Sequence, residues 1–127
     1  MTLAQVGFFR ELRHGHPNGP SLEEAVGKLH ASDVGGILRY LENAPTLAAT
    51  GSVVDDALSP DRTGVAKLEI ATDGEWVWPR DLAYYVRQYD VGLPAEFIAL
   101  IDSRAGLSPE LDREALSRAA VEFLEGS

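Results

Sequence analysis

Six of the seven carboxylates between residues 55 and 81 are the side chains best suited to acid–base chemistry or to binding a divalent cation. They are Asp55, Asp56, Asp61, Asp73, Glu75 and Asp81. Their spacing selects no pair among them, and the loop that carries the first three does not match the D-x-[DN]-x-[DN]-G pattern of a calcium-binding hand. Aspartate is also common in turns, where it bonds the nearby backbone. We therefore predict no catalytic residue and no metal site here.

Three histidines, His14, His16 and His30, offer imidazoles that could bind a metal. No carboxylate lies beside them at ligand spacing, and the first two belong to the Gly- and Pro-rich stretch HGHPNGP, so we predict solvated loop histidines. The sequence contains no G-x-S-x-G motif, P-loop or dinucleotide fingerprint, and the members of a catalytic triad meet only in space. We predict no cofactor, and a non-enzymatic role is favoured.

The stretch TDGEWVWPRDLAYYV, residues 72–86, contains both tryptophans and permits two interpretations. Trp76 and Trp78 are two residues apart on a predicted strand and therefore share one face. We predict that this face packs into the core, because large aromatic side chains usually lie inside and Tyr85 and Tyr89 can cover them. The alternative is an aromatic-edged groove at Trp76, Trp78 and Tyr84, which would serve a ligand-binding or metal-assisted function.

The elements that position these residues follow from the spacing of apolar side chains. We predict a single α+β domain over residues 1–127, with a small antiparallel sheet of about three to four strands flanked by N-terminal and C-terminal helices. Residues 1–44 are predicted to be helical, 45–78 to form strands and 79–127 to be helical. The first helix is predicted over 3–13, where Leu3, Val6, Phe9 and Leu12 approximate a helical stripe.

Local signals set the predicted boundaries of these elements. Ser21 and Glu24 have the spacing of a capping box, and Asp33 is a candidate N-cap for a helix that ends near Asn43. The remaining signals are a type I′ turn at Asp73-Gly74 between the strands 65–72 and 75–78, helix starts at Pro79 and Pro94, and a cap at Ser108-Pro109-Glu110 for the last helix.

Composition and charge favour a protein partner over a nucleic acid. Residues 1–40 sum to zero charge, whereas residues 41–127 hold seven basic and sixteen acidic groups, and 7 − 16 gives the whole net charge of −9. An acidic surface repels phosphate backbones and attracts basic partners, although solubility alone also explains it. The chain has no cysteine and no apolar run long enough to span a membrane, so we predict a cytoplasmic protein.

These observations lead to an acidic protein-binding domain that captures a basic partner. Residues in loops and at hairpin tips are usually exposed, so we predict that the acids at such positions form the contact surface. These residues are Asp55, Asp56, Asp61, Asp73 and Glu75. The pattern does not specify the oligomeric state.

Two segments resemble a family of small, uncharacterised actinobacterial proteins. The first is the run DGEWVWPRDLAYYV followed by LPAEF, which has the pattern D-G-x-W-x-W-P-x-D-L-x-Y-Y, and the second is FRELRHGHP with GPSL. The resemblance extends to about residue 101, and the segment from Ser108 onward lies outside it. It implies a likeness to immunity proteins, small acidic binders that neutralise a secreted toxin, and it assigns no functional residue.

Overall fold

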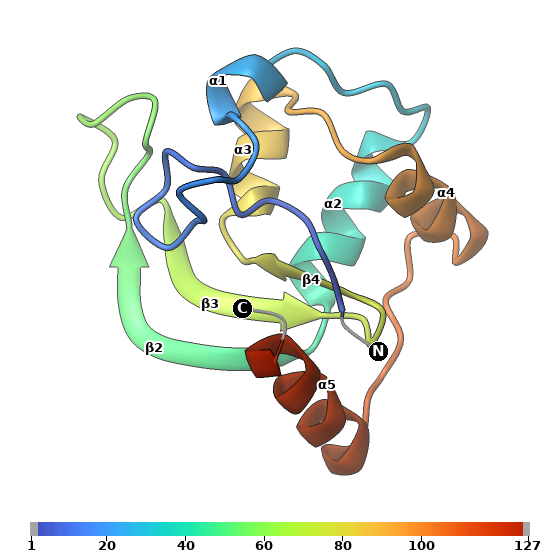
Figure 1. The fold of residues 1–127 in the computed structure, drawn as a ribbon. Coiled ribbons are helices and arrows are strands. Elements are labelled where there is room, and N and C mark those ends of the chain that lie inside the picture. Colours follow the sequence, from blue (N-terminus) through green and yellow to red (C-terminus); the bar gives the residue numbers. More distant parts are fainter. Residues whose placement is uncertain (1–2, 126–127) are drawn as a thin grey trace.

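The computed structural model describes residues 3–125 of the chain and has an α+β architecture, as predicted. Figure 1 shows one sheet with helices packed around it. The elements in chain order are β1 (Ala4–Gln5), α1 (Leu22–Ala25), α2 (Val34–Asn43), β2 (Thr46–Val54), β3 (Ala66–Thr72), β4 (Trp76–Pro79), α3 (Leu82–Tyr89), α4 (Ala95–Ser103) and α5 (Arg113–Glu125). Within residues 3–125, every helix falls short of the length and apolarity that a membrane span requires.

The sheet has four strands in the order β1-β4-β3-β2. The strands β2, β3 and β4 form the predicted antiparallel part. The short strand β1 adds to β4 in parallel, with Ala4 opposite Trp76 and Gln5 opposite Val77, which makes the sheet mixed. The strand β2 therefore forms the edge opposite β1.

The predicted helix over residues 3–13 is wrong, because this segment begins as β1 and continues as an irregular chain. Its large apolar side chains are all buried, but they belong to two different clusters. Leu3 and Phe8 pack on one side, whereas Val6, Phe9 and Leu12 join the larger core. The spacing of about three residues therefore comes from burial on two sides of a non-helical segment. This spacing happens to resemble the periodicity of a helix.

The core lies mainly between the sheet and the helices α2, α3 and α4 (Figure 1). Trp78, Tyr40, Tyr85 and Phe97 are fully buried there. On the other face of the sheet, Val77 joins a smaller cluster that α5 covers with Ala119 and Phe123. Both faces of β4 are therefore covered, which confirms the core position of Trp78 and also buries Val77.

The predicted hairpin between β3 and β4 is present, but its turn differs from the predicted type I′. Gly74 has a φ of +93°, whereas Asp73 is not among the residues with positive φ. Asp73 instead binds the turn through its side chain, because its Oδ1 accepts from the amides of Glu75 at 2.9 Å and Trp76 at 2.6 Å. These two bonds stabilise the turn in the manner of an Asx turn.

Helix α2 begins and ends as predicted, since the Gly36 amide donates to Asp33 Oδ1 at 2.9 Å and the helix ends at Asn43. The predicted helix start at Pro79 is wrong. Pro79 is the last residue of β4, opposite Ile70, and α3 begins at Leu82. Sheet pairing outweighs the preference of proline for a first helical turn.

The last helix also begins later than predicted. It starts at Arg113, where Asp112 Oδ1 accepts from the Ala115 amide at 2.8 Å. The predicted cap at Ser108-Pro109-Glu110 therefore lies in the connection before α5. Both segments offer an acidic or hydroxyl cap, and sequence spacing alone does not decide between them.

Candidate functional site

The five predicted contact acids do not form one surface. Asp55, Asp56 and Asp61 lie in the loop between β2 and β3, whereas Asp73 and Glu75 lie in the hairpin after β3. The two groups are therefore at opposite ends of β3, as Figure 1 shows. The loop group and the hairpin group have different surroundings.

Asp56 is buried, with 1% of its surface exposed, so the expected exposure is wrong for this residue. Its Oδ2 accepts from the hydroxyls of Tyr84 at 2.7 Å and Tyr89 at 2.6 Å, and its Oδ1 accepts from the amides of Leu58 and Ser59. Burial alone would raise the pKa of Asp56, but these hydrogen bonds outweigh it and leave the pKa below its usual value. The carboxylate thus fixes the loop to α3.

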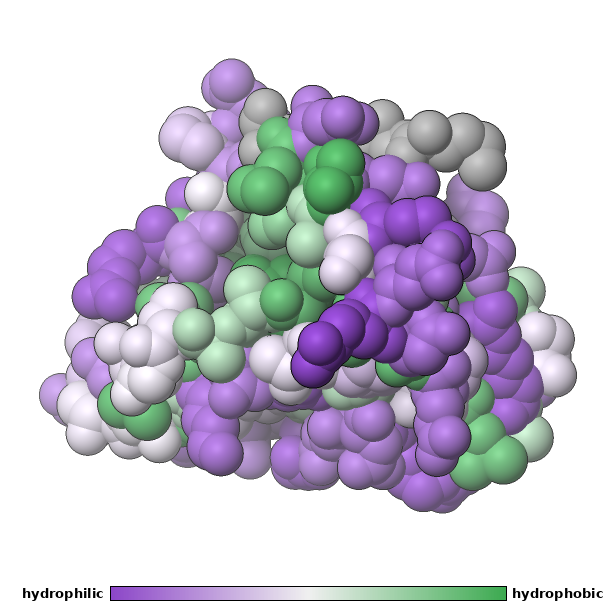
Figure 2. Space-filling view, turned by 90° about the horizontal axis from the view of Figure 1, so that it is seen from below, coloured by the Kyte–Doolittle hydropathy of each residue, from purple (hydrophilic) through white to green (hydrophobic). Residues whose placement is uncertain are grey.

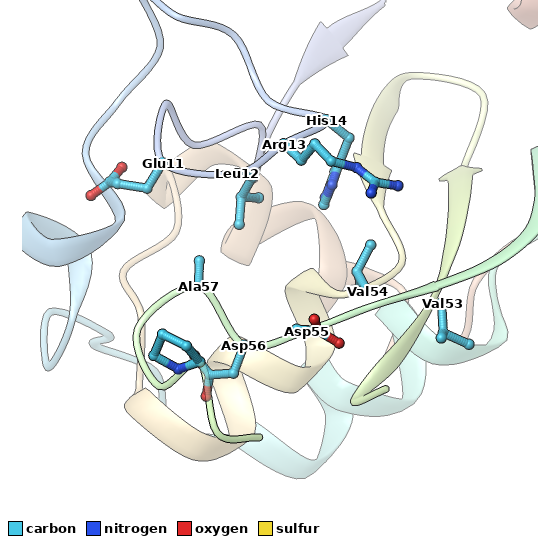
Figure 3. Close-up of a pocket in the computed structure, with 10 residues that line it drawn as sticks. Glu11, Leu12, Arg13, His14, Val53, Val54, Asp55, Asp56 and Ala57 are labelled. Carbon is cyan, nitrogen blue, oxygen red and sulfur yellow. The ribbon is translucent and has the colours of Figure 1, made fainter. Parts of the chain in front are cut away.

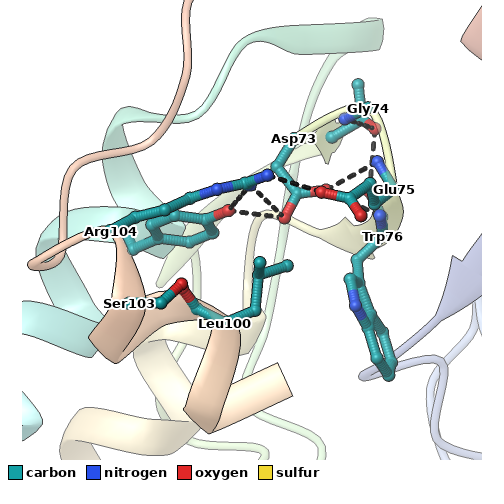
Figure 4. Close-up of polar contacts among 9 residues, drawn as sticks. Asp73, Gly74, Glu75, Trp76, Leu100, Ser103 and Arg104 are labelled. Carbon is teal, nitrogen blue, oxygen red and sulfur yellow. Dashed lines mark hydrogen bonds and ion pairs between the residues drawn. The ribbon is translucent and has the colours of Figure 1, made fainter. Parts of the chain in front are cut away.

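Asp73 is also buried, at 3% exposure, and it connects three elements (Figure 4). The Tyr40 hydroxyl from α2 donates to its Oδ2 at 2.5 Å, and Arg104 from the end of α4 lies 3.5 Å from the same oxygen. Arg104 also forms an ion pair with Glu75 at 2.5 Å. Burial and the Asp73 carboxylate together raise the pKa of the Tyr40 hydroxyl well above its usual value. Asp73 is therefore a structural residue, and its expected exposure is also wrong.

Three of the predicted acids remain exposed: Asp55, Asp61 and Glu75. Glu75 exposes 59% of its side chain although it pairs with Arg104. Asp55 Oδ1 accepts from the Gly64 amide at 2.9 Å, which leaves its second oxygen for other contacts. The exposed carboxylates of the loop are thus Asp55 and Asp61, and they are not shared with the hairpin.

A groove of about 320 Å³ separates this loop from the N-terminal segment (Figure 3). The N-terminal segment contributes residues 11–14, and the end of β2 with the following loop contributes residues 53–57 and Pro60. Glu11 and Arg13 line it on one side and Asp55 lines it on the other. Charges of both signs therefore line the groove.

His14 is the residue in this groove with the most reactive side chain. Its Nε2 lies 3.0 Å from Asp81 Oδ2, at the start of α3, which is close enough for an ion pair. The contact is not aligned as a hydrogen bond, and within residues 3–125 neither ring nitrogen has a hydrogen-bond partner. Both nitrogens are buried, so neither can accept a proton from a molecule in the groove. The pair connects the N-terminal segment to α3 and provides no general base.

The expectation of solvated histidines is therefore wrong for His14, and it is also wrong for His16. His16 Nε2 donates to Gln5 Oε1 at 2.5 Å, and its ring lies 5.2 Å from that of Phe8. The third histidine, His30, is exposed. Within the described residues, no three His, Cys, Asp or Glu side chains are arranged to hold a metal ion.

The three residues of the alternative aromatic groove do not share one surface. Trp78 is fully buried, and its indole donates to the Leu41 carbonyl at 3.3 Å. Trp76 packs on Phe97 with ring centroids 4.8 Å apart, whereas the Tyr84 hydroxyl is held by Asp56. Trp76 and Tyr84 thus belong to different parts of the molecule.

Sequence reasoning missed two residues that organise these regions, Glu11 and Arg104. The Glu11 carboxylate accepts from the Ser21 hydroxyl and from the amides of Leu22 and Glu23. The Ser21 hydroxyl itself accepts from the Glu24 amide, which is the first of the two bonds that the capping box predicts. Although burial alone would raise the pKa of Glu11, the amide bonds from Glu23 and Leu22 outweigh it and lower the pKa. The partners of both residues are distant in sequence, so no local pattern identifies them.

No protein-family model, curated protein sequence or solved structure matches this chain. The function must therefore be argued from the chain's own geometry and charge.

Proposed function

We propose that this protein is a non-enzymatic, cytoplasmic, acidic domain that binds and neutralises a basic protein partner, in the manner of an immunity protein. The contact surface is centred on the loop between β2 and β3, where Asp55 and Asp61 are exposed. Asp56 supports this surface from inside, because it holds the loop on Tyr84 and Tyr89. Glu75, at the other end of β3, lies outside this surface.

One observation carries the proposal: the basic side chains of the acidic region are mostly occupied within the protein. All seven basic residues in 41–127 lie within the described part of the chain, and four of them are in ion pairs with described carboxylates. They are Arg80 with Glu69, Arg87 with Glu42, Arg104 with Asp73 and Glu75, and Arg118 with Glu114. Most of the remaining carboxylates of this region therefore face solvent with few positive charges of the protein beside them. A basic partner can supply the missing positive charge.

The test compares two double variants that change the net charge by the same amount. The partner is first captured on the immobilised protein and identified, and its dissociation constant is then measured for Asp55→Asn/Asp61→Asn and for the control Asp90→Asn/Glu96→Gln. All four residues are exposed. We expect the loop variant to bind at least about 10-fold more weakly and the control to change by less than about 3-fold.

The salt dependence and the partner's activity complete the test. Binding should weaken as the NaCl concentration rises, because the attraction between exposed charges is screened. The partner's own activity should fall when this protein is added. Equal effects of the two double variants, or a partner without a basic surface, would contradict the proposal.

A further inference from the structure

The strand β2 is an open edge of the sheet. It pairs with β3 on one side and is the terminal strand of the sheet on the other. Eight of its nine residues are not buried, and only Val54 is. One row of its backbone N–H and C=O groups thus has no strand to pair with among residues 3–125, and such a row is a template for a further strand.

Proteins usually protect an open edge with lysine, with proline, with a very short strand or with a β-bulge. The sequence of β2 is TLAATGSVV, which is nine residues long and contains neither lysine nor proline. Its register shifts twice, between Thr46 and Ala48 and between Ala49 and Val53, and the strand bends at the second shift, where Gly51 has a φ of +79°. The bend divides the strand into two arms, and the arm from Gly51 to Val54 leads directly to Asp55.

The charges around this edge specify what can pair with it. Between residues 45 and 61 the charged residues are the acids Asp55, Asp56 and Asp61, and the basic residues Arg62 and Lys67 follow, with Lys67 of β3 opposite Val53. A second copy of the chain would bring a net charge of −9 to a surface of the same sign. An extended segment that carries lysine or arginine can pair with the uncharged strand β2 and place its positive charges near the exposed carboxylates that follow it. The two surfaces are therefore complementary in charge.

Side chains of a further strand would also meet apolar surface. The strand β2 and the helix α5 are the lowest elements in Figure 1, and they pack together through Leu47 and Phe123 in the smaller cluster. Figure 2 views this side from below and shows hydrophobic residues gathered in a strip with hydrophilic residues around it. Alternate side chains of a strand can lie on such a strip while the others point to solvent.

We propose that the basic partner binds by strand addition, with an extended segment of the partner pairing along the β2 edge beside Asp55 and Asp61. This inference rests on the proposed function, and it names the backbone of β2 as the part that recognises the partner. Main-chain hydrogen bonds contribute affinity in this mode, while alternate side chains contribute specificity.

The experiment uses synthetic peptides and the intact chain. The probe is an acetylated peptide of alternating valine and lysine, titrated into the isotope-labelled protein and followed by amide chemical shifts. We expect the shifts to concentrate between Gly51 and Asp61. The same peptide with alternate backbone nitrogens methylated should bind at least about 10-fold more weakly, because it keeps its charge but loses the backbone donors. The glutamate analogue should not bind.

Two exposed valines give a matched pair of protein variants. Val53 on β2 is 59% exposed and Val121 on α5 is 54% exposed, so Val53→Lys and Val121→Lys change charge and exposed surface almost equally. We expect Val53→Lys to weaken peptide binding at least about 10-fold, since lysine protects an edge, and Val121→Lys to change it by less than about 3-fold. Melting temperatures of both variants establish that they are folded.

The outcomes separate strand addition from acidic capture alone. Equal binding of the parent and methylated peptides overturns strand addition. It does not contradict binding of a basic partner through the exposed acids Asp55 and Asp61. Chemical-shift changes that concentrate away from β2, or no binding of the basic peptide, also overturn strand addition. The proposed function is tested separately, by the dissociation constants of the Asp55 and Asp61 variants for the partner. A dimer in light scattering that Val53→Lys dissociates would show that a second copy occupies the edge, which contradicts the inference.

Discussion

At the scale of single residues, neighbouring acids have opposite roles. Asp55 and Asp56 are adjacent in the sequence, yet Asp55 is exposed and Asp56 is buried. The carboxylate of Asp56 satisfies two tyrosine hydroxyls and two backbone amides, and a charged group in such a network is costly to remove. A charge reversal at both positions would therefore mix a surface effect with a structural one.

We expect Asp56→Ala to lower the free energy of unfolding by about 3 kcal/mol, because it leaves buried donors without an acceptor. Asp55→Ala is the adjacent control and should cost less than about 1 kcal/mol, since its bond to Gly64 is exposed. Urea denaturation at neutral pH measures both. Equal losses would show that Asp56 does not hold the loop.

The Asp56 carboxylate should also make the free energy of unfolding depend on pH. The pKa of Asp56 is lower in the folded protein than its usual value of 3.8, so the ionised form stabilises the fold above about pH 4. This contribution is lost as the pH falls through the lowered pKa, when the carboxyl takes up its proton. The difference in unfolding free energy between the wild type and Asp56→Asn should therefore shrink as the pH falls below about 4. A constant difference over that range would contradict this assignment.

At the scale of elements, the first turn of α2 contains two consecutive glycines that look alike in the sequence but differ in their surroundings. A Cβ at Gly35 would lie 3.8 Å from Asp33 Oδ1, which is ordinary contact. A Cβ at Gly36 would overlap the Asp33 carboxylate, which caps this helix through the Gly36 amide. Helix propensity favours alanine at both positions by about 1 kcal/mol, so the cap decides the difference.

We expect Gly35→Ala to raise the free energy of unfolding by about 0.5–1 kcal/mol. Gly36→Ala should be neutral or destabilising, because displacing the Asp33 cap costs about 1 kcal/mol and offsets the gain in propensity. Thermal and urea unfolding of the two variants provide the measurement. A gain at Gly36 equal to that at Gly35 would show that the cap tolerates the added methyl group.

At the scale of the whole molecule, the net charge of −9 acts on stability and on binding with opposite signs. The unpaired carboxylates repel one another in the folded state, and salt screens this repulsion. Exposed ion pairs such as Arg118 with Glu114 contribute little, so their screening costs little. We therefore expect the melting temperature to rise by roughly 2–5 °C between about 10 mM and 0.5 M NaCl.

The same increase in salt should weaken capture of a basic partner. Sodium sulfate is a poor control, because it also strengthens hydrophobic burial, so the comparison uses NaCl alone. A melting temperature that falls with NaCl would mean that the internal ion pairs outweigh the self-repulsion. That result would contradict the view that the exposed carboxylates are mostly unpaired and repel one another, on which the proposed function depends.

The sequence by itself determined the parts of this protein whose causes are local. The cap at Asp33, the end of α2, the strands β2 and β3 and the existence of the hairpin after β3 all depend on residues within a few positions of one another. The count of charged residues also identified the acidic region, because such a count does not depend on the three-dimensional structure.

Only the tertiary structure decided which acids are exposed and what the N-terminal segment becomes. Asp56 meets tyrosines 28 and 33 positions away, and Asp73 meets Tyr40 at a separation of 33. Residues 4–5 become a strand because β4 offers them an edge, although their apolar spacing resembles that of a helix. Burial is a property of the assembled fold, so a carboxylate whose hydrogen-bond donors arrive from distant elements cannot be distinguished in sequence from its exposed neighbour.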